Sequence, residues 1–199
     1  VILPDGSIQH PKKGTPQGGI LSPILANIVL NELDWWIVSQ WEKHQTRHNY
    51  DWTKNGVINR GNKYRALRGT HLKEMYIVRY ADDFKIFCRK RSDADKVFMA
   101  TKIWLKKRLK LQVNEDKSKV INLKKHSSNC LGFTIRLIKK RKTLVIKSNM
   151  NTKAKKRIKL NLVQQIKRIQ HAENLAKQNI EVEKYNSMVI GIHQYYKKA

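Results

Sequence analysis

Residues 74–88 read EMYIVRYADDFKIFC, in which two strand-like runs flank the tetrapeptide Tyr80-Ala81-Asp82-Asp83. The pattern predicts a β-hairpin that carries two adjacent carboxylates at its tip. Like charges this close repel each other, and a bound divalent cation with oxygen ligands would remove that cost. Taken alone, the tetrapeptide also fits an ordinary turn, because aspartate side chains form hydrogen bonds within turns. The rest of the chain has to decide between a metal site and a turn.

The charge of the chain is strongly and unevenly basic. Its 199 residues include 42 Lys and Arg against 15 Asp and Glu, a net charge of +27. Residues 84–148 hold 20 basic and 4 acidic side chains, net +16, whereas residues 1–83 hold 11 and 8, net +3. Nucleic acid is the expected partner of such a chain, and an anionic membrane surface is the competitor. No apolar run approaches the roughly 20 residues needed to span a bilayer, so we expect no membrane partner.

Two cysteines, Cys88 and Cys130, lie in apolar stretches without the spacing of metal ligands. We expect buried free thiols, which fit a reducing intracellular location such as a bacterial cytoplasm or an organelle. The seven His are scattered, and none is assigned to a metal.

Helical periodicity on both sides of the acidic hairpin predicts an α+β fold. Apolar residues recur at helical spacing over 22–44, and Ser22 followed by proline is expected to cap that helix. A second helix is expected over 92–110 with Ser92 as its N-cap, followed by short strands at 111–113 and 120–123.

The last third of the chain predicts a basic hairpin followed by helices. Strands at 131–138 and 143–147 are turned by four cations at 139–142, which would suit phosphate contact or protect a strand end. From residue 149 the pattern is helical, with polar residues 170–180 expected between two helices.

Two Gly-containing segments leave alternatives open. Residues 14–19 (GTPQGG) allow a backbone to approach another surface closely, with the Gln17 amide as donor and acceptor, or they form a flexible loop. Residues 45–72 predict a long loop or small insertion in which aromatic residues alternate with cations. Those aromatic side chains either stack on RNA bases or anchor the loop; the set is Tyr50, Trp52 and Tyr64 with Lys54, Arg60, Lys63 and Arg65.

Five ordered blocks resemble the reverse transcriptases that group II introns encode. The catalytic block of that family is similar to RYADDF at 79–84, and GTPQGGILSP from residue 14 is similar to the block that precedes it. The three later blocks correspond to residues 111–119, to Leu131-Gly132-Phe133, and to 185–196 at the end of the thumb. Because the blocks stand in family order and span nearly the whole chain, the ordinary-turn interpretation of Asp82 and Asp83 loses its support.

The resemblance implies a polymerase architecture. Residues 1–148 would form a partial palm, with an antiparallel sheet backed by the two helices, that lacks the fingers and the first catalytic strand. Residues 149–199 would form a helical thumb, also called the maturase domain.

The resemblance also implies roles for individual residues. Asp82 corresponds to the metal-binding catalytic aspartate, and Asp83 is its neighbour and a second implied metal ligand. Further roles follow from family position: nucleotide and template contacts for Pro16, Gln17, Gly18 and Ala81, approach to the triphosphate for Lys117, and the primer grip for Leu131, Gly132 and Phe133.

The implied function is RNA-directed DNA polymerase with Mg²⁺ as cofactor, using dNTPs on an RNA/DNA template-primer. The implied partner is group II intron RNA, which the protein would copy and help to fold for splicing. The alternative is an RNA-binding splicing cofactor with an idle polymerase site; a retained pair of buried acids argues against it.

The family site also uses an aspartate from an upstream strand that this sequence lacks. We therefore expect a C-terminal portion of a polymerase, completed by an N-terminal portion or a second subunit. By itself the chain is expected to be inactive and to hold Mg²⁺ weakly.

Overall fold

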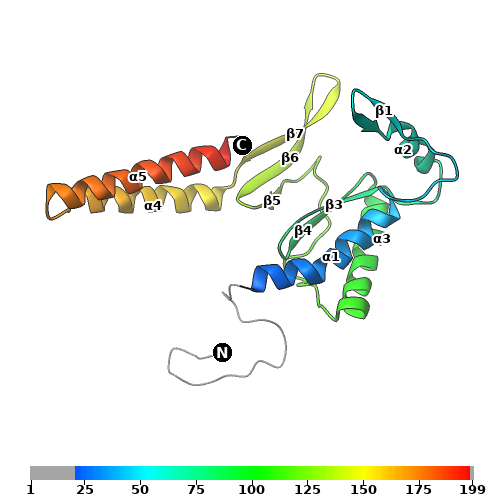
Figure 1. The fold of residues 1–199 in the computed structure, drawn as a ribbon, viewed down its shortest axis with the longest axis horizontal. Coiled ribbons are helices and arrows are strands. Elements are labelled where there is room, and N and C mark those ends of the chain that lie inside the picture. Colours follow the sequence, from blue (N-terminus) through cyan, green and yellow to red (C-terminus); the bar gives the residue numbers. More distant parts are fainter. Residues whose placement is uncertain (1–20, 198–199) are drawn as a thin grey trace. The chain divides into compact units, whose positions relative to one another are not determined.

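Helices and small antiparallel sheets make up the chain, and the computed structural model describes residues 21–197 (Figure 1). The chain divides into two compact units, Val1–Val120 and Ile121–Ala199. The first contains α1 (Ser22–Gln40), β1 (Trp52–Lys54), β2 (Val57–Asn59), α2 (Gly61–Arg68), β3 (Met75–Tyr80), β4 (Asp83–Cys88), α3 (Arg91–Trp104) and the π-helix η1 (Leu105–Leu109). The second contains β5 (Ser128–Cys130), β6 (Phe133–Lys140), β7 (Thr143–Met150), α4 (Thr152–Gln170) and α5 (Leu175–Tyr196). This mixture confirms the α+β class.

The core of the first unit lies between α1 and the β3–β4 hairpin. Leu33, Ile37 and Trp41 are fully buried on α1 and just after it; α1 packs against β3, while α3 packs against β4. On β4, Phe84, Ile86 and Cys88 contact this core from one face, as their alternation predicts. Helices therefore support the acidic hairpin on the strands' apolar face.

The first turns of α1 depart from the sequence prediction. The N-cap is Leu21 rather than Ser22 and forms no side-chain cap, and the helix ends at Gln40 instead of reaching residue 44. Ile24 and Ile28 are more than half exposed, because the core that buries this helix is built around the residues of its second half. The predicted apolar stripe is thus core only from Leu30 onward.

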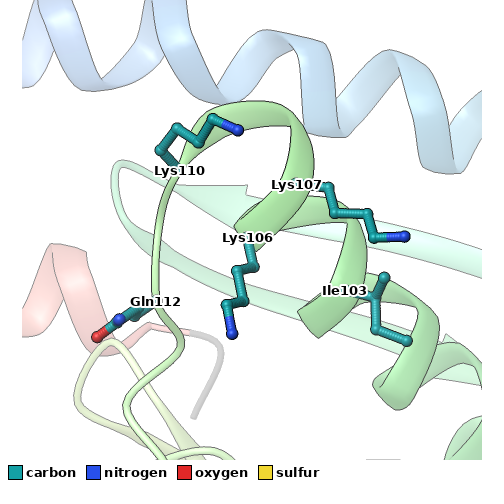
Figure 2. A pocket seen from close by; sticks show the side chains of 5 residues that line it. All are labelled: Ile103, Lys106, Lys107, Lys110 and Gln112. Carbon is teal, nitrogen blue, oxygen red and sulfur yellow. The ribbon is translucent and has the colours of Figure 1, made fainter.

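The end of α3 widens into a basic turn. Helix α3 begins at Arg91 after Lys90, so Ser92 is not its cap; Asp93 lies in the first turn, where the helix dipole favours an acid. The π-helix η1 follows and stops at Lys110, whose φ is +58°. Figure 2 shows the shallow pocket of this turn, lined by Ile103, Lys106, Lys107, Lys110 and Gln112. Cations are favoured at a helix C-terminus, which by itself accounts for these lysines.

The predicted strands at 111–113 and 120–123 do not form. Among the described residues neither segment joins any of the three sheets, so neither finds the ladder of hydrogen bonds that a strand needs. The chain instead turns at 115–117, where the Asn114 side chain accepts a hydrogen bond from the Lys117 backbone N–H at 3.1 Å.

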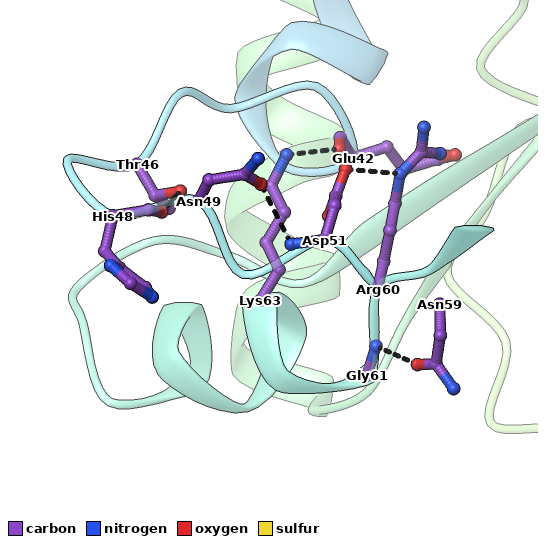
Figure 3. Close-up of polar contacts among 9 residues, drawn as sticks. All are labelled: Glu42, Thr46, His48, Asn49, Asp51, Asn59, Arg60, Gly61 and Lys63. Atoms are coloured by element: carbon purple, nitrogen blue, oxygen red, sulfur yellow. Dashed lines mark hydrogen bonds and ion pairs between the residues drawn. The ribbon is translucent and has the colours of Figure 1, made fainter. Parts of the chain in front are cut away.

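Residues 45–72 form a structured insertion rather than a long loop. Strands β1 and β2 pair antiparallel from Trp52↔Asn59 to Lys54↔Val57, and the intervening Asn55 and Gly56 both have positive φ. That turn is the usual one for an Asn-Gly hairpin, because its twist matches that of the strands. Figure 3 shows polar contacts within the insertion, such as Arg60 with Asp51, and the hydrogen bond from Lys63 to the Glu42 carbonyl just after α1.

The second unit has a three-stranded sheet followed by two helices. Strands β6 and β7 form the predicted basic hairpin, with strands at 133–140 and 143–150, and β5 pairs on the other side of β6. Asn151 and Asn174 cap α4 and α5 with their side chains. Because Asn174 starts α5, the predicted polar spacer at 170–180 is mostly helical.

The unit boundary falls after Val120, so the β5–β7 sheet belongs with the helices. The assignment of residues 1–148 to a palm and 149–199 to a thumb stays a prediction. None of the helices in the described part is long and apolar enough to cross a lipid bilayer.

Candidate functional site

The acidic tetrapeptide closes the β3–β4 hairpin as the sequence predicts. Tyr80 pairs with Asp83, which leaves Ala81 and Asp82 as the two-residue turn. Ala81 has a φ of +52°, a left-handed conformation that costs an L-residue about 1–2 kcal/mol. Contacts from outside the turn must therefore hold it.

Arg79, near the end of β3, supplies those contacts. Its guanidinium donates to the Asp34 carboxylate of α1, with Nη2–Oδ2 at 2.6 Å, and to Asn27 Oδ1 at 2.8 Å. The Nη1 atom that donates to Asn27 also donates to the Ala81 carbonyl at 2.9 Å. One nearly buried side chain thus fixes the strained turn to α1.

The electrostatics of this clamp are favourable. The Asp34 hydrogen bond raises the pKa of the Arg79 guanidinium above its usual value, so the group is charged throughout the accessible pH range. Only 11% of the Arg79 side chain and 29% of the Asp34 side chain are exposed, which limits screening by water. Sequence reasoning missed the roles of Arg79 and Asp34 in holding the turn; Arg79 lies inside the quoted RYADDF block, whereas nothing in the sequence marks Asp34.

Asp82 and Asp83 are exposed, and no described residue forms a hydrogen bond or ion pair with either side chain. The expectation of buried acids is therefore wrong. The reason is that the hairpin is a two-stranded sheet in the described part of the chain, so no third strand shields its tip. Within residues 21–197 nothing neutralises the two carboxylates, so both can accept ligands.

The donor chemistry at this tip fits Mg²⁺. Mg²⁺ prefers hard oxygen ligands and is commonly held by one or two carboxylates together with water and substrate phosphates. Asp82 and Asp83 supply two such carboxylates. Within residues 21–197 no group of three or more metal-ligating side chains is present, so no complete protein cage is formed there.

Lys117 lies in the exposed turn after α3. Its turn is attached to α3 through Glu115, whose carboxylate accepts from Lys102 Nζ at 2.5 Å; this hydrogen bond lowers the pKa of Glu115. No recorded hydrogen bond or ion pair joins Lys117 to Asp82 or Asp83. The structure thus brings Ala81 and the two aspartates together, while Lys117 forms no hydrogen bond or ion pair with these described residues.

The predicted primer-grip residues form a second tight turn, between β5 and β6. Leu131 and Gly132 have φ values of +48° and +81°. The Leu131 carbonyl accepts from Tyr195 Oη at 2.8 Å, and a Cβ on Gly132 would lie 2.5 Å from Tyr196 Oη. The Phe133 ring packs on both tyrosines, with centroid distances of 5.4 and 5.0 Å. Two blocks that are separate in sequence therefore form one structure in the second unit.

The remaining predicted site residues, Pro16, Gln17 and Gly18, lie outside the described residues.

Comparisons with known proteins agree with the motifs. The family model described as reverse transcriptase (RNA-dependent DNA polymerase) matches residues 5–135. Protein YkfC of Escherichia coli K12 is 30% identical over 138 residues, which are 68% of this chain and 35% of that protein. The group II intron-encoded protein LtrA of Lactococcus lactis is 27% identical over 155 aligned residues, 62% of this chain and 26% of that protein.

These matches confirm the resemblance on which the site residues were assigned. The chain spans about a third or less of the length of these two relatives. The family match covers most of the chain and includes the acidic hairpin, so the chain belongs to the reverse transcriptase (RNA-dependent DNA polymerase) family.

Proposed function

We propose that this chain is the portion of an RNA-directed DNA polymerase that carries the acidic catalytic hairpin, and that the intact protein copies intron RNA into DNA. The observation that carries the proposal is the pair of exposed carboxylates at Asp82 and Asp83, which no described residue neutralises and which stand on a turn that Arg79 clamps to α1. A turn without such a task has no reason to keep two adjacent uncompensated acids on a strained backbone.

Nucleotide addition is an in-line displacement at phosphorus, and bound Mg²⁺ would activate the primer hydroxyl and neutralise the departing pyrophosphate. Asp82 and Asp83 provide its oxygen ligands. Arg79 keeps those ligands oriented, because it fixes the Ala81 carbonyl next to them. Ala81 itself presents only a methyl group where the nucleotide sugar would lie.

The other assigned residues position substrates. Lys117, whose exposed ammonium pairs with no residue of the described part, would meet the triphosphate of the incoming dNTP. Pro16, Gln17 and Gly18 would contact the templating base and the nucleotide. The turn Leu131-Gly132-Phe133 would hold the primer end, and its rigidity comes from Tyr195 and Tyr196.

The domain proposal follows the family pattern. Residues 1–148 form part of a palm and residues 149–199 the thumb, and an N-terminal portion or a second subunit supplies the third catalytic aspartate. The chain by itself is then inactive and binds Mg²⁺ weakly, in an intracellular setting. Calorimetric titration of the isolated chain that found tight Mg²⁺ binding, lost in Asp82→Ala, would contradict the need for a third carboxylate.

A second candidate function is an RNA-binding splicing cofactor that no longer polymerises. The net charge of +27 supports it, as do the four cations at the β6–β7 turn and the lysines and arginines spread over α4. Group II intron RNA is the proposed ligand in both cases, because LtrA, one of the relatives, is a group II intron-encoded protein.

Asp82→Ala in the full-length protein separates the two functions. We expect it to abolish cDNA synthesis on a primed RNA template while the affinity for intron RNA stays unchanged. The matched control is Asp95→Ala, which removes an exposed aspartate that pairs with Arg91 on α3. Undiminished synthesis by Asp82→Ala would end the metal assignment, and a wild-type protein that binds intron RNA without synthesis would favour the splicing cofactor.

A further inference from the structure

The β1–β2 hairpin exposes side chains on both of its faces. All six strand residues are exposed, and three of them are large and apolar: Trp52 at 44%, Val57 at 68% and Ile58 at 54%. A two-stranded hairpin is marginally stable on its own in water, and a tryptophan gains most from burial of its large ring. This hairpin therefore has an apolar surface for which the described residues provide no cover.

The base of the hairpin is firmly attached to the core of the first unit. Tyr64 of α2 stacks on Trp41 with ring centroids 6.0 Å apart, and Leu67 of the same helix is buried in that core. Lys63 Nζ donates to the Glu42 carbonyl at 3.2 Å (Figure 3). The hairpin thus projects from a fixed support.

The aromatic side chains within residues 45–72 differ in their surroundings. Tyr64 is an anchor, and Tyr50 packs edge-on against His48 with centroids 4.7 Å apart. Only Trp52 of this set lies on the exposed hairpin. Of the three aromatic residues, Tyr64 thus anchors the insertion, Tyr50 packs on a neighbouring ring, and Trp52 remains exposed.

Charge identifies the kind of partner that suits this surface. Residues 45–72 contain six Lys and Arg and one acid, Asp51. Trp52 and Lys54 share one face of β1, because side chains alternate along a strand, and the register places Asn59 opposite Trp52. Lys54 has no ion pair or hydrogen bond with another described residue. A flat ring, an unpaired cation and an amide on one face match an unstacked base and its phosphate.

We propose that the β1–β2 hairpin, residues 52–59, binds single-stranded RNA, with Trp52 stacked on a base and Lys54 at the adjacent phosphate. The inference rests on the proposed RNA-binding function of the protein. It does not depend on polymerase chemistry, since no hairpin residue belongs to the candidate catalytic site.

The test measures RNA affinity of the full-length protein by fluorescence anisotropy, with a short unstructured RNA and a fully paired duplex of equal length. We expect Trp52→Ala to weaken binding of the single strand about tenfold, the effect of losing one base–aromatic stack. Trp52→Phe should restore most of the affinity, and duplex binding should not change. Lys54→Ala should lower the slope of log affinity against log salt by about 0.7 for one lost phosphate contact.

The matched control is Trp35→Ala on α1. Trp35 is 54% exposed, but Lys43 Nζ lies 4.0 Å from its ring centroid and covers one ring face. We expect this variant to bind RNA as the wild type does, and urea unfolding of each variant checks that it is folded.

The outcomes separate this inference from the function on which it rests. If the wild type binds RNA and Trp52→Ala binds it equally well, or loses duplex binding in the same proportion, the hairpin assignment is overturned and the proposed function stands. A wild type without affinity for RNA overturns both. Loss of self-association in Trp52→Ala, with RNA affinity intact, would assign the hairpin to protein contact instead.

Discussion

The turn at Gly132 provides a stringent test of how the second unit packs, because its geometry disfavours any residue except glycine. Gly132 has a φ of +81°, and a Cβ atom there would lie 2.5 Å from Tyr196 Oη. The replacement Gly132→Ala therefore strains the backbone and displaces a packed aromatic ring at the same time.

The two costs can be estimated separately. A left-handed conformation costs an L-residue about 1–2 kcal/mol. Displacement of Tyr196 weakens its contact with Phe133, whose ring centroid lies 5.0 Å away, and such an aromatic pair contributes about 0.5–1.5 kcal/mol. We expect Gly132→Ala to lower the free energy of unfolding by about 2–3 kcal/mol in all.

A double-mutant cycle with Tyr196→Phe, measured by urea unfolding, isolates the contact. Removal of the hydroxyl leaves the Tyr196 ring carbon Cζ as the nearest atom, at 3.5 Å from the added Cβ, which is an ordinary contact. In the Tyr196→Phe background, Gly132→Ala should therefore cost about 1 kcal/mol less than in the wild type.

Gly191→Ala is the matched control, because Gly191 lies inside α5 and an added Cβ meets no atom within 4 Å. It should stabilise the protein by about 0.5–1 kcal/mol through helix propensity. If Gly132→Ala costs the same in both backgrounds, or does not destabilise the protein at all, the close approach of the turn to Tyr196 is refuted.

Three other predictions concern local contacts. Arg79→Lys should slow primer extension by the full-length protein and lower its stability by roughly 1–3 kcal/mol, since one ammonium cannot serve Asp34 and the turn carbonyl together. Asn151→Ala should cost about 1 kcal/mol in urea unfolding by removing the cap of α4. Burial and the nearby carboxylate of Asp93 raise the pKa of the Cys88 thiol to about 11, so in a Cys130→Ser background iodoacetamide labelling should be slow at pH 8 and accelerate toward pH 11. Rapid labelling at pH 8, unchanged stability without the cap, or full activity of Arg79→Lys would each contradict the corresponding contact.

Features that repeat over a few residues could be predicted from the sequence. The β3–β4 and β6–β7 hairpins and helices α1, α3 and α4 follow from the alternation or helical spacing of their apolar residues, which is a local property. Helix ends were harder to predict from the sequence. Ser22 and Ser92 are suitable caps by residue type, yet each lies inside its helix instead of at the cap position before it. The cap depends on the direction from which the chain approaches the helix.

The short strands predicted at 111–113 and 120–123 failed for a related reason. A strand is stable only when a neighbour completes its hydrogen bonds, and sequence alone does not supply that neighbour. Conversely, β1 and β2 were missed because residues 45–72 contain few apolar residues, although Asn55-Gly56 was the available signal for a hairpin.

The sequence by itself determined that Asp82 and Asp83 lie together at a hairpin tip, that the chain is strongly basic, and which family it belongs to. These are consequences of short-range pattern and of composition. Only the tertiary structure decided that the two acids are exposed, that Arg79 binds Asp34 across 45 positions, and that Leu131 meets Tyr195 across 64. Contacts over such separations depend on how helices and strands pack, because the entropy of closing the intervening chain is offset only in the folded protein.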